Sequence, residues 1–277
     1  MGAKKMSAVI KGNMAVYDAK TKLSLAKLIF LGILAGVFIA IGASSSSAAT
    51  YGITNTGVAK TLAGVIFPVG LMLVVIMGAE LFTGDCLMIL GVVDKKIKLT
   101  SMIRVLVVVF VSNLVGSLIV VLLVNQSGQL DYGNGALAAS VIKTAYTKIN
   151  LGFVKCFCSG IMCNILVCLA VLFAGAAHHI MGKIWGIFFC IWAFVIAGYE
   201  HCVANMYYIP AGILAKTSDT YYDAAVQAGM TATQMDSMTM GRFFIDNLLP
   251  VTLGNIVGGM LFVAIPLYIG NKHEIQD

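Results

Sequence analysis

The sequence predicts an all-α polytopic membrane protein with six transmembrane helices, two of them broken (the second and the fifth), in one domain spanning residues 1–277. Hydrophobic residues make up 60% of the chain and charged residues only 11%, whereas soluble domains have about 45–50% and 25%. Long apolar runs recur between short polar segments, and two of these runs carry ionisable residues near their centres. Such residues are costly at membrane depth and usually functional.

The N-terminal segment, residues 1–23, is basic with interspersed apolar residues, so we expect a short amphipathic helix on the membrane surface. The first apolar run, 28–43, predicts the first span, and its glycines favour close packing on neighbouring helices. The serines at 44–47 resemble a signal-peptide cleavage site, but the basic segment before the run is too long for a signal peptide.

The second run, residues 61–93, is too long for one span and too short for two. At about 33 residues it would form a helix of about 50 Å, against a hydrocarbon core of about 30 Å. We therefore predict a span that is broken near 81–85. The polar residues lie in the stretch Gly78-Ala79-Glu80-Leu81-Phe82-Thr83-Gly84-Asp85.

The remaining runs complete the set of six. The run at 184–214 repeats the length anomaly, with its break at Glu200-His201. Residues 125–150 and the segment after 214 are polar, and we expect loops there. The other predicted spans are 102–124, 153–174 and 243–269.

The two halves of the chain resemble each other, which predicts inverted three-helix repeats over about 24–125 and 151–270. Three spans is an odd number, so the copies insert in opposite orientations and bring the two breaks together near the midplane. Most basic residues fall on one side of the predicted topology, so we expect both termini to be cytoplasmic. The matching stretches are Gly32-Ile33-Leu34-Ala35-Gly36 with Gly160-Ile161-Met162-Cys163-Asn164, and Asn113-Leu114-Val115-Gly116 with Asn255-Ile256-Val257-Gly258.

The breaks favour an anion path, because the N-terminus of a half-helix attracts anions and irregular backbone at depth must line a cavity or be buried in protein. His201 can donate a hydrogen bond or a proton to a small anion, although a lone histidine is often a buried core residue. Thr83 either lines the path or caps a helix. We expect Glu80 and Glu200 to accept the unpaired backbone N–H groups at the breaks.

Lys148 lies at the mouth of a span, where it either raises the local positive potential or simply snorkels to the interface. The net charge of +6 fits cytoplasmic loops facing an anionic leaflet rather than a nucleic-acid partner.

The seven cysteines show no metal or redox spacing, so we expect no metal, no cofactor and no enzymatic activity. Apolar side chains at the breaks predict either constrictions or ordinary core: Phe67, Leu71, Leu81, Phe82 and Phe194.

Over nearly its whole length the sequence resembles the formate/nitrite transporter family. The resemblance rests on five stretches: Phe67-Pro68-Val69-Gly70-Leu71, Gly78–Gly84, Asn164–Ala170, Gly198–Met206 and Asp246–Asn255. It implies an aquaporin-like protomer in a homopentamer, with one pore in each protomer.

The resemblance also implies roles for single residues. His201 looks like the central pore histidine, Thr83 like the threonine facing it, and Lys148 like a lysine that polarises the imidazole. Leu71 and Phe194 would form a cytoplasmic slit. Phe67, Leu81 and Phe82 would line the pore elsewhere, and Asn164, Asn205 and Asn255 would be structural.

These likenesses lead us to expect a channel for small monovalent anions of weak acids in the plasma or inner membrane of a prokaryote, in contact with lipid. Overall likeness is greatest to the hydrosulfide-channel branch, so hydrosulfide comes first, then formate, nitrite and chloride. Pro68 and Gly84 replace serines more usual in formate channels. A proton-coupled formate or nitrite transporter stays open. An aquaporin-type facilitator of neutral solutes is the alternative of another class, although paired Asn-Pro-Ala motifs are absent.

Overall fold

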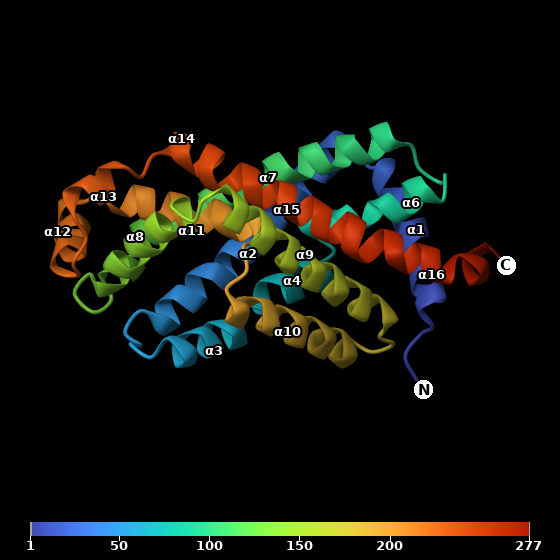
Figure 1. Cartoon of the computed structure of the whole chain (residues 1–277), viewed down its shortest axis with the longest axis horizontal. Helices are drawn as coiled ribbons and strands as arrows, with labels where there is room; N and C mark the ends of the chain where they lie inside the picture. Colours follow the sequence, from blue (N-terminus) through green and yellow to red (C-terminus); the bar gives the residue numbers. More distant parts are fainter. Residues whose placement is uncertain (1, 277) are drawn as a thin grey trace.

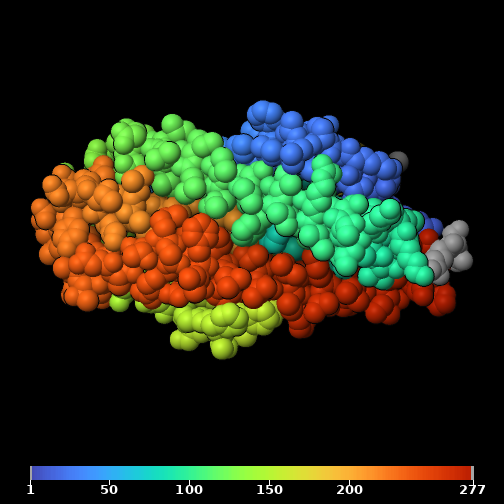
Figure 2. Space-filling model, turned by 90° about the horizontal axis from the view of Figure 1, so that it is seen from above, coloured from blue at the N-terminus to red at the C-terminus, as the bar shows by residue number. Residues whose placement is uncertain are grey.

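The computed structural model describes residues 2–276, and all regular secondary structure within them is helical. Figure 1 shows an elongated bundle with both chain ends at one end of the molecule and the small helices α12 and α13 at the other. Figure 2 shows the same elongation from a second direction. Within the described residues, six helical segments are long and apolar enough to cross a membrane: Leu25–Thr50, Thr56–Met77, Leu99–Gln126, Phe153–Ala176, Ile180–Ala197 and Met240–Ile275.

The first half of the chain holds three crossings, the second of them divided. Its elements are α1 (Met6–Thr21), α2 (Leu25–Thr50), α3 (Thr56–Ile66), α4 (Val69–Met77), α5 (Phe82–Asp85), the 3-10 turn η1 (Cys86–Met88), α6 (Ile89–Val93) and α7 (Leu99–Gln126).

The second half repeats this plan after a short connecting region. Its elements are the 3-10 turn η2 (Gln129–Asp131), α8 (Ala136–Ile149), α9 (Phe153–Ala176), α10 (Ile180–Ala197), α11 (Cys202–Ala215), α12 (Asp219–Gln227), α13 (Ala232–Asp236), α14 (Met240–Arg242), α15 (Leu249–Val257) and α16 (Ile265–Gln276), with π-helical segments η3 (Phe243–Leu248) and η4 (Gly258–Ala264) in the last crossing.

The two breaks have the same backbone geometry. Helix α4 ends at Gly78 and α10 ends at Gly198, with left-handed φ angles of 70° and 73° that glycine adopts without steric cost. The chain then becomes extended at Leu81 and His201, the residues that precede the new helices α5 and α11. The second break lies where the sequence predicts it, whereas the first begins at Gly78, before the predicted 81–85.

Matching helix pairs pack closely in both halves. A β-carbon at Gly36 would overlap the backbone of Asn113, so α2 and α7 approach to the limit that glycine allows. A β-carbon at Gly258 would likewise overlap the backbone of Ile161, so η4 and α9 approach equally closely. These are the first and third spans of each half, as the inverted-repeat alignment expects.

Two predicted loops are wrong. Residues 136–149 form α8, and the segment after 214 contains α12 and α13. Helix α8 buries Leu137, Val141 and Ile142 within the protein. Helix α8 is too short, and too polar outside that face, to resemble a membrane span in the sequence.

Two further expectations need correction. Helix α2 continues through the serines to Thr50, because hydroxyls bond back to the helix, as from Ser47 to the Ala43 carbonyl (3.1 Å). Helix α1 does not lie free on a membrane surface, since Ile10 and Met14 are buried in the protein.

The chain ends and the basic segments meet at one end of the molecule. The backbone N–H of Lys4 donates to Ala176 at the end of α9 (3.1 Å), and Ser7 donates to Glu274 (2.8 Å). The connections α6–α7 and α9–α10 lie at this same end (Figure 1). The two termini therefore lie on the same side of any membrane that the bundle crosses.

Candidate functional site

An asparagine on α7 holds the first break in place. The side-chain oxygen of Asn113 accepts the backbone N–H of Phe82 (3.0 Å), the first residue of α5. Its amide group donates to the carbonyls of Gly32 (2.7 Å) and Glu80 (3.0 Å). One buried side chain thus satisfies a helix start and two backbone carbonyls that lipid cannot satisfy.

Asn255 on α15 does the same for the second break. Its oxygen accepts the N–H of Cys202 (2.9 Å), and its amide donates to the carbonyls of Gly160 (2.8 Å) and Glu200 (3.1 Å). The predicted capping role of the Glu80 and Glu200 carboxylates is therefore wrong, because both carboxylates point instead to lysines. Asn113 was missing from the predicted site residues, although the repeat alignment already pairs it with Asn255.

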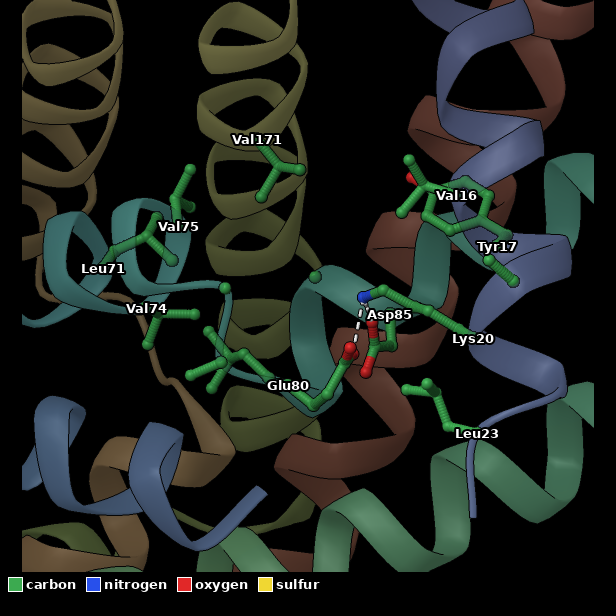
Figure 3. Close-up of a pocket in the computed structure, with 15 residues that line it drawn as sticks. Val16, Tyr17, Lys20, Leu23, Leu71, Val74, Val75, Glu80, Asp85 and Val171 are labelled. Atoms are coloured by element: carbon green, nitrogen blue, oxygen red, sulfur yellow. Dashed lines mark hydrogen bonds and ion pairs between the residues drawn. The ribbon is translucent and has the colours of Figure 1, made fainter. Parts of the chain in front are cut away.

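A cavity of about 330 Å³ lies beside α1 at the first break, and we call it the α1-side vestibule. Figure 3 shows Lys20 reaching from α1 toward two acidic side chains. Its Nζ lies 2.6 Å from Glu80 Oε2 and 2.6 Å from Asp85 Oδ1. Leu71 and Leu81 line the same cavity. Lys20 belongs to the basic segment 1–23, and no sequence signal pairs it with Glu80.

Lys20 stays charged in this setting. Burial on its own lowers the pKa of the Lys20 ammonium, but the nearby carboxylates of Asp85 and Glu80 outweigh burial and raise that pKa above its ordinary value. The first vestibule thus contains one fixed cation shared between two carboxylates.

A second cavity, of about 310 Å³, lies beside α8 at the second break, and we call it the α8-side vestibule. Lys148 donates to Glu200 Oε1 (2.8 Å), while Asn205 donates to Glu200 Oε2 (2.7 Å) and to Asn247 (2.8 Å). Lys148 therefore contacts the carboxylate beside His201, rather than the imidazole.

The apolar residues divide between the vestibules in an unexpected way. Phe67 and Phe194 pack edge to face with ring centroids 5.5 Å apart, and both line the α8-side vestibule. Leu71 lines the other vestibule, so Leu71 and Phe194 do not line one cavity together, and a slit between them stays a prediction. Phe82 packs on Phe110 of α7, with ring centroids 4.9 Å apart, and lines neither vestibule.

Thr83 and His201 meet where the two breaks come together. Thr83 Oγ1 lies 2.8 Å from His201 Nε2, and both residues are buried. Nδ1 of His201 accepts the backbone N–H of Ala204 (3.1 Å) and therefore carries no proton. The proton of the neutral ring lies on Nε2, which donates to the threonine hydroxyl.

Asn164 on α9 connects the two breaks. Its amide donates to the carbonyl of Thr83 (3.2 Å) and to that of Asn255 (2.7 Å). Asn255 in turn holds Cys202 and Glu200, so one amide network fixes both sides of the contact between Thr83 and His201. Within residues 2–276, no group of three or more His, Cys, Asp or Glu side chains is placed to hold a metal ion.

Comparison with known proteins covers almost the whole chain. Residues 7–269 match the family described as formate/nitrite transporter. A probable formate transporter of Methanothermobacter thermautotrophicus is 41% identical over 272 residues, 92% of each chain. The formate channel FocA of Escherichia coli (strain K12) is 36% identical over 248 residues, 88% of this chain and 86% of that one.

Solved structures agree with these relatives. A pentameric formate channel with formate bound superposes with a TM-score of 0.79 at 33% identity, covering 90% of this chain and 98% of that chain. An ion channel of the FNT family has the same TM-score at 28% identity, covering 95% and 98%.

Proposed function

This chain belongs to the formate/nitrite transporter family, and on that premise we propose that it is a channel for small monovalent anions of weak acids. The family consists of transporters and channels, so the expectation that the chain is not an enzyme is confirmed. The observation that carries the proposal is the contact of Thr83 with His201 between two lysine-containing vestibules.

The order of substrates is hydrosulfide, then formate and nitrite. Formate is supported by the relatives named as formate channels and by the structural neighbour that holds formate. Hydrosulfide is supported by overall likeness to the hydrosulfide-channel branch.

In the mechanism the anion passes first a vestibule, then an apolar pair of rings, and then a polar pair of side chains. The anion enters through a vestibule, and the Phe67–Phe194 pair strips part of its water. Because Nε2 of His201 donates to Thr83, the threonine hydroxyl keeps its own proton to donate to the anion. His201 thus polarises Thr83, and the pair replaces hydration at the narrowest part of the path.

The assembly is a homopentamer with one pore in each protomer, in the inner membrane of a prokaryote with both termini cytoplasmic. Residues 1–277 form a single channel domain. The pentameric neighbour and the large exposed apolar side chains support assembly within lipid. The clustering of basic segments at the end that holds both termini supports the orientation.

The test is anion flux into liposomes that contain the pure protein, measured for hydrosulfide, formate, nitrite and chloride from pH 5 to 8. We expect hydrosulfide and formate to enter, with protein-free liposomes as the control. Flux that requires a proton gradient would identify the alternative, a proton-coupled transporter. Passage of water or glycerol with no anion flux would contradict the proposal.

A further inference from the structure

A second lysine, Lys60 on α3, lies in the α8-side vestibule and has no role in the site described above. It lines the cavity together with His201 and the Phe67–Phe194 pair. Its Nζ lies 2.9 Å from the position that a β-carbon on Gly198 would occupy. The ammonium group therefore sits over the turn that leads into Glu200 and His201.

The charge of Lys60 is uncompensated, unlike that of Lys148. Lys148 is paired with Glu200 at 2.8 Å, so this pair adds no net charge. Within residues 2–276, no carboxylate oxygen lies within 4.0 Å of the Lys60 ammonium. Lys60 thus gives its vestibule a net positive charge, whereas the α1-side vestibule holds two carboxylates and one ammonium.

Neutral donors surround this charge. Ser140 and Thr144 on α8 line the same vestibule, and among residues 2–276 neither hydroxyl has a hydrogen-bond partner. A small anion near Lys60 thus finds a cation and free hydroxyl donors in one cavity, the combination that recognises a compact monovalent anion.

The position of Lys60 places it before the apolar constriction. Phe67 follows Lys60 by seven residues, at the end of the same helix, which puts it on the same helix face about 10 Å further along. An anion that enters from the α8 side passes the ammonium first and the phenyl rings second.

We propose that Lys60 forms the capture site for small monovalent anions in the α8-side vestibule, where the anion binds before it loses water between Phe67 and Phe194. The proposal rests on the function proposed above and adds a binding step to it. Lys60 also lies near the C-terminal end of α10, where a cation stabilises the helix dipole. If Lys60 had only this structural role, replacing it would change the stability of the protein but not the salt dependence of anion flux.

The first test compares native protein with Lys60→Met, Lys60→Arg and Lys143→Met in liposomes. Lys143 is an exposed lysine of α8 outside the cavity and serves as the matched control. For formate and hydrosulfide below saturation and at low salt, we expect Lys60→Met to slow entry about threefold to tenfold. The difference should shrink at about 0.5 M of an impermeant salt, where the Debye length is only a few ångström. Lys60→Arg should keep the native rate.

Chemical restoration of the charge separates capture from folding. In Lys60→Cys, aminoethylation of the thiol should restore entry, and sulfonatoethylation should slow it further. Native protein given the same reagents controls for the exposed Cys158. Equal rates for native and Lys60→Met at all salt concentrations, or no effect of the attached charge, would overturn the capture site. Absence of anion flux in the native protein would instead overturn the proposed function.

Discussion

Thr83 Oγ1 and His201 Nε2 lie 2.8 Å apart although 118 positions separate them in the sequence. The other ring nitrogen of His201 accepts the N–H of Ala204 and so caps α11. Protonation at Nδ1 would break this cap, which links the charge state of the imidazole to the start of the helix. His201 therefore caps α11 with one ring nitrogen and contacts Thr83 with the other.

Replacing His201 with Asn should change pH dependence and selectivity more than assembly. An asparagine side chain can still cap α11, but it does not titrate. We expect a pentamer on size-exclusion chromatography with native elution, and a changed ratio of hydrosulfide flux to formate flux. Flux in His201→Asn with the native pH profile would exclude a proton role for the imidazole.

Replacing Thr83 with Val should reduce anion flux about tenfold or more, because the isosteric side chain fills the space but has no hydroxyl to donate. Thr83→Ser keeps the hydroxyl and is the matched control, with flux expected near the native value. Initial rates of formate and hydrosulfide entry provide the measurement. Native flux in Thr83→Val would show that the hydroxyl does not contact the anion.

Removing the amide of Asn255 should destabilise the protein strongly. Asn255→Ala leaves the buried N–H of Cys202 and two carbonyls without partners, at a cost of about 2–5 kcal/mol. Asn113→Ala should lower the thermal midpoint by a similar amount, since it makes the same three bonds at the other break. Gln126→Ala, at an exposed position, is the control. Unequal shifts for the two asparagines would show that the breaks are not equivalent.

Shortening Phe194 should widen the constriction on the α8 side. Phe194→Ala removes one ring of the edge-to-face pair with Phe67, so we expect faster flux and weaker discrimination between hydrosulfide and the larger formate. Phe189 on the same helix is exposed, and Phe189→Ala should leave the flux and the discrimination between the two anions unchanged. A native selectivity ratio in Phe194→Ala would place the barrier elsewhere, for example at Leu71 or Leu81.

The docking of α1 should not respond to an increase of pH in the neutral range. The pKa of Lys20 is above its ordinary value in the folded protein. The contribution of the Lys20 ammonium to the contact with Glu80 and Asp85 is therefore fully present below the ordinary lysine pKa of about 10.4, and that contribution is lost as pH rises through the higher folded value.

Hydrogen exchange of the α1 amides measures this docking. After correction for intrinsic exchange rates, protection should be equal at pH 7 and pH 9. Lys20→Met should lower protection at both values, and Lys11→Met, at an exposed position of α1, should not. Release of α1 in the native protein between pH 7 and 9 would contradict the assignment of the contact to Lys20.

The sequence predicted the features that carry a cost in lipid. The ionisable residues Glu200 and His201 lie inside an apolar run and indicate a break, because such residues are costly at membrane depth and are usually functional. The sequence also pairs Gly32 with Gly160 and Asn113 with Asn255. In the structure the carbonyls of these two glycines accept the side-chain amides of Asn113 and Asn255. These features are local or periodic, and a single chain shows them directly.

Partnerships between distant segments were less predictable. Nothing in the sequence distinguishes Phe67 from Leu71 as the neighbour of Phe194, because the crossing of α3 and α10 decides it. Lys20 and Lys60 likewise look like ordinary interfacial lysines until the fold places them in vestibules. Helix α8 was missed because its apolar face is covered by protein rather than lipid.

The connection from Asn164 to Thr83 has a consequence for biogenesis. The first break satisfies Phe82 and Glu80 through Asn113, so this part can form as soon as α7 has left the ribosome. The Thr83 carbonyl receives the amide of Asn164 only once α9 has been synthesised and inserted. A nascent chain stalled after α7 therefore lacks the donor to the Thr83 carbonyl, and the contact of Thr83 with His201 forms late, once the second half of the chain has docked.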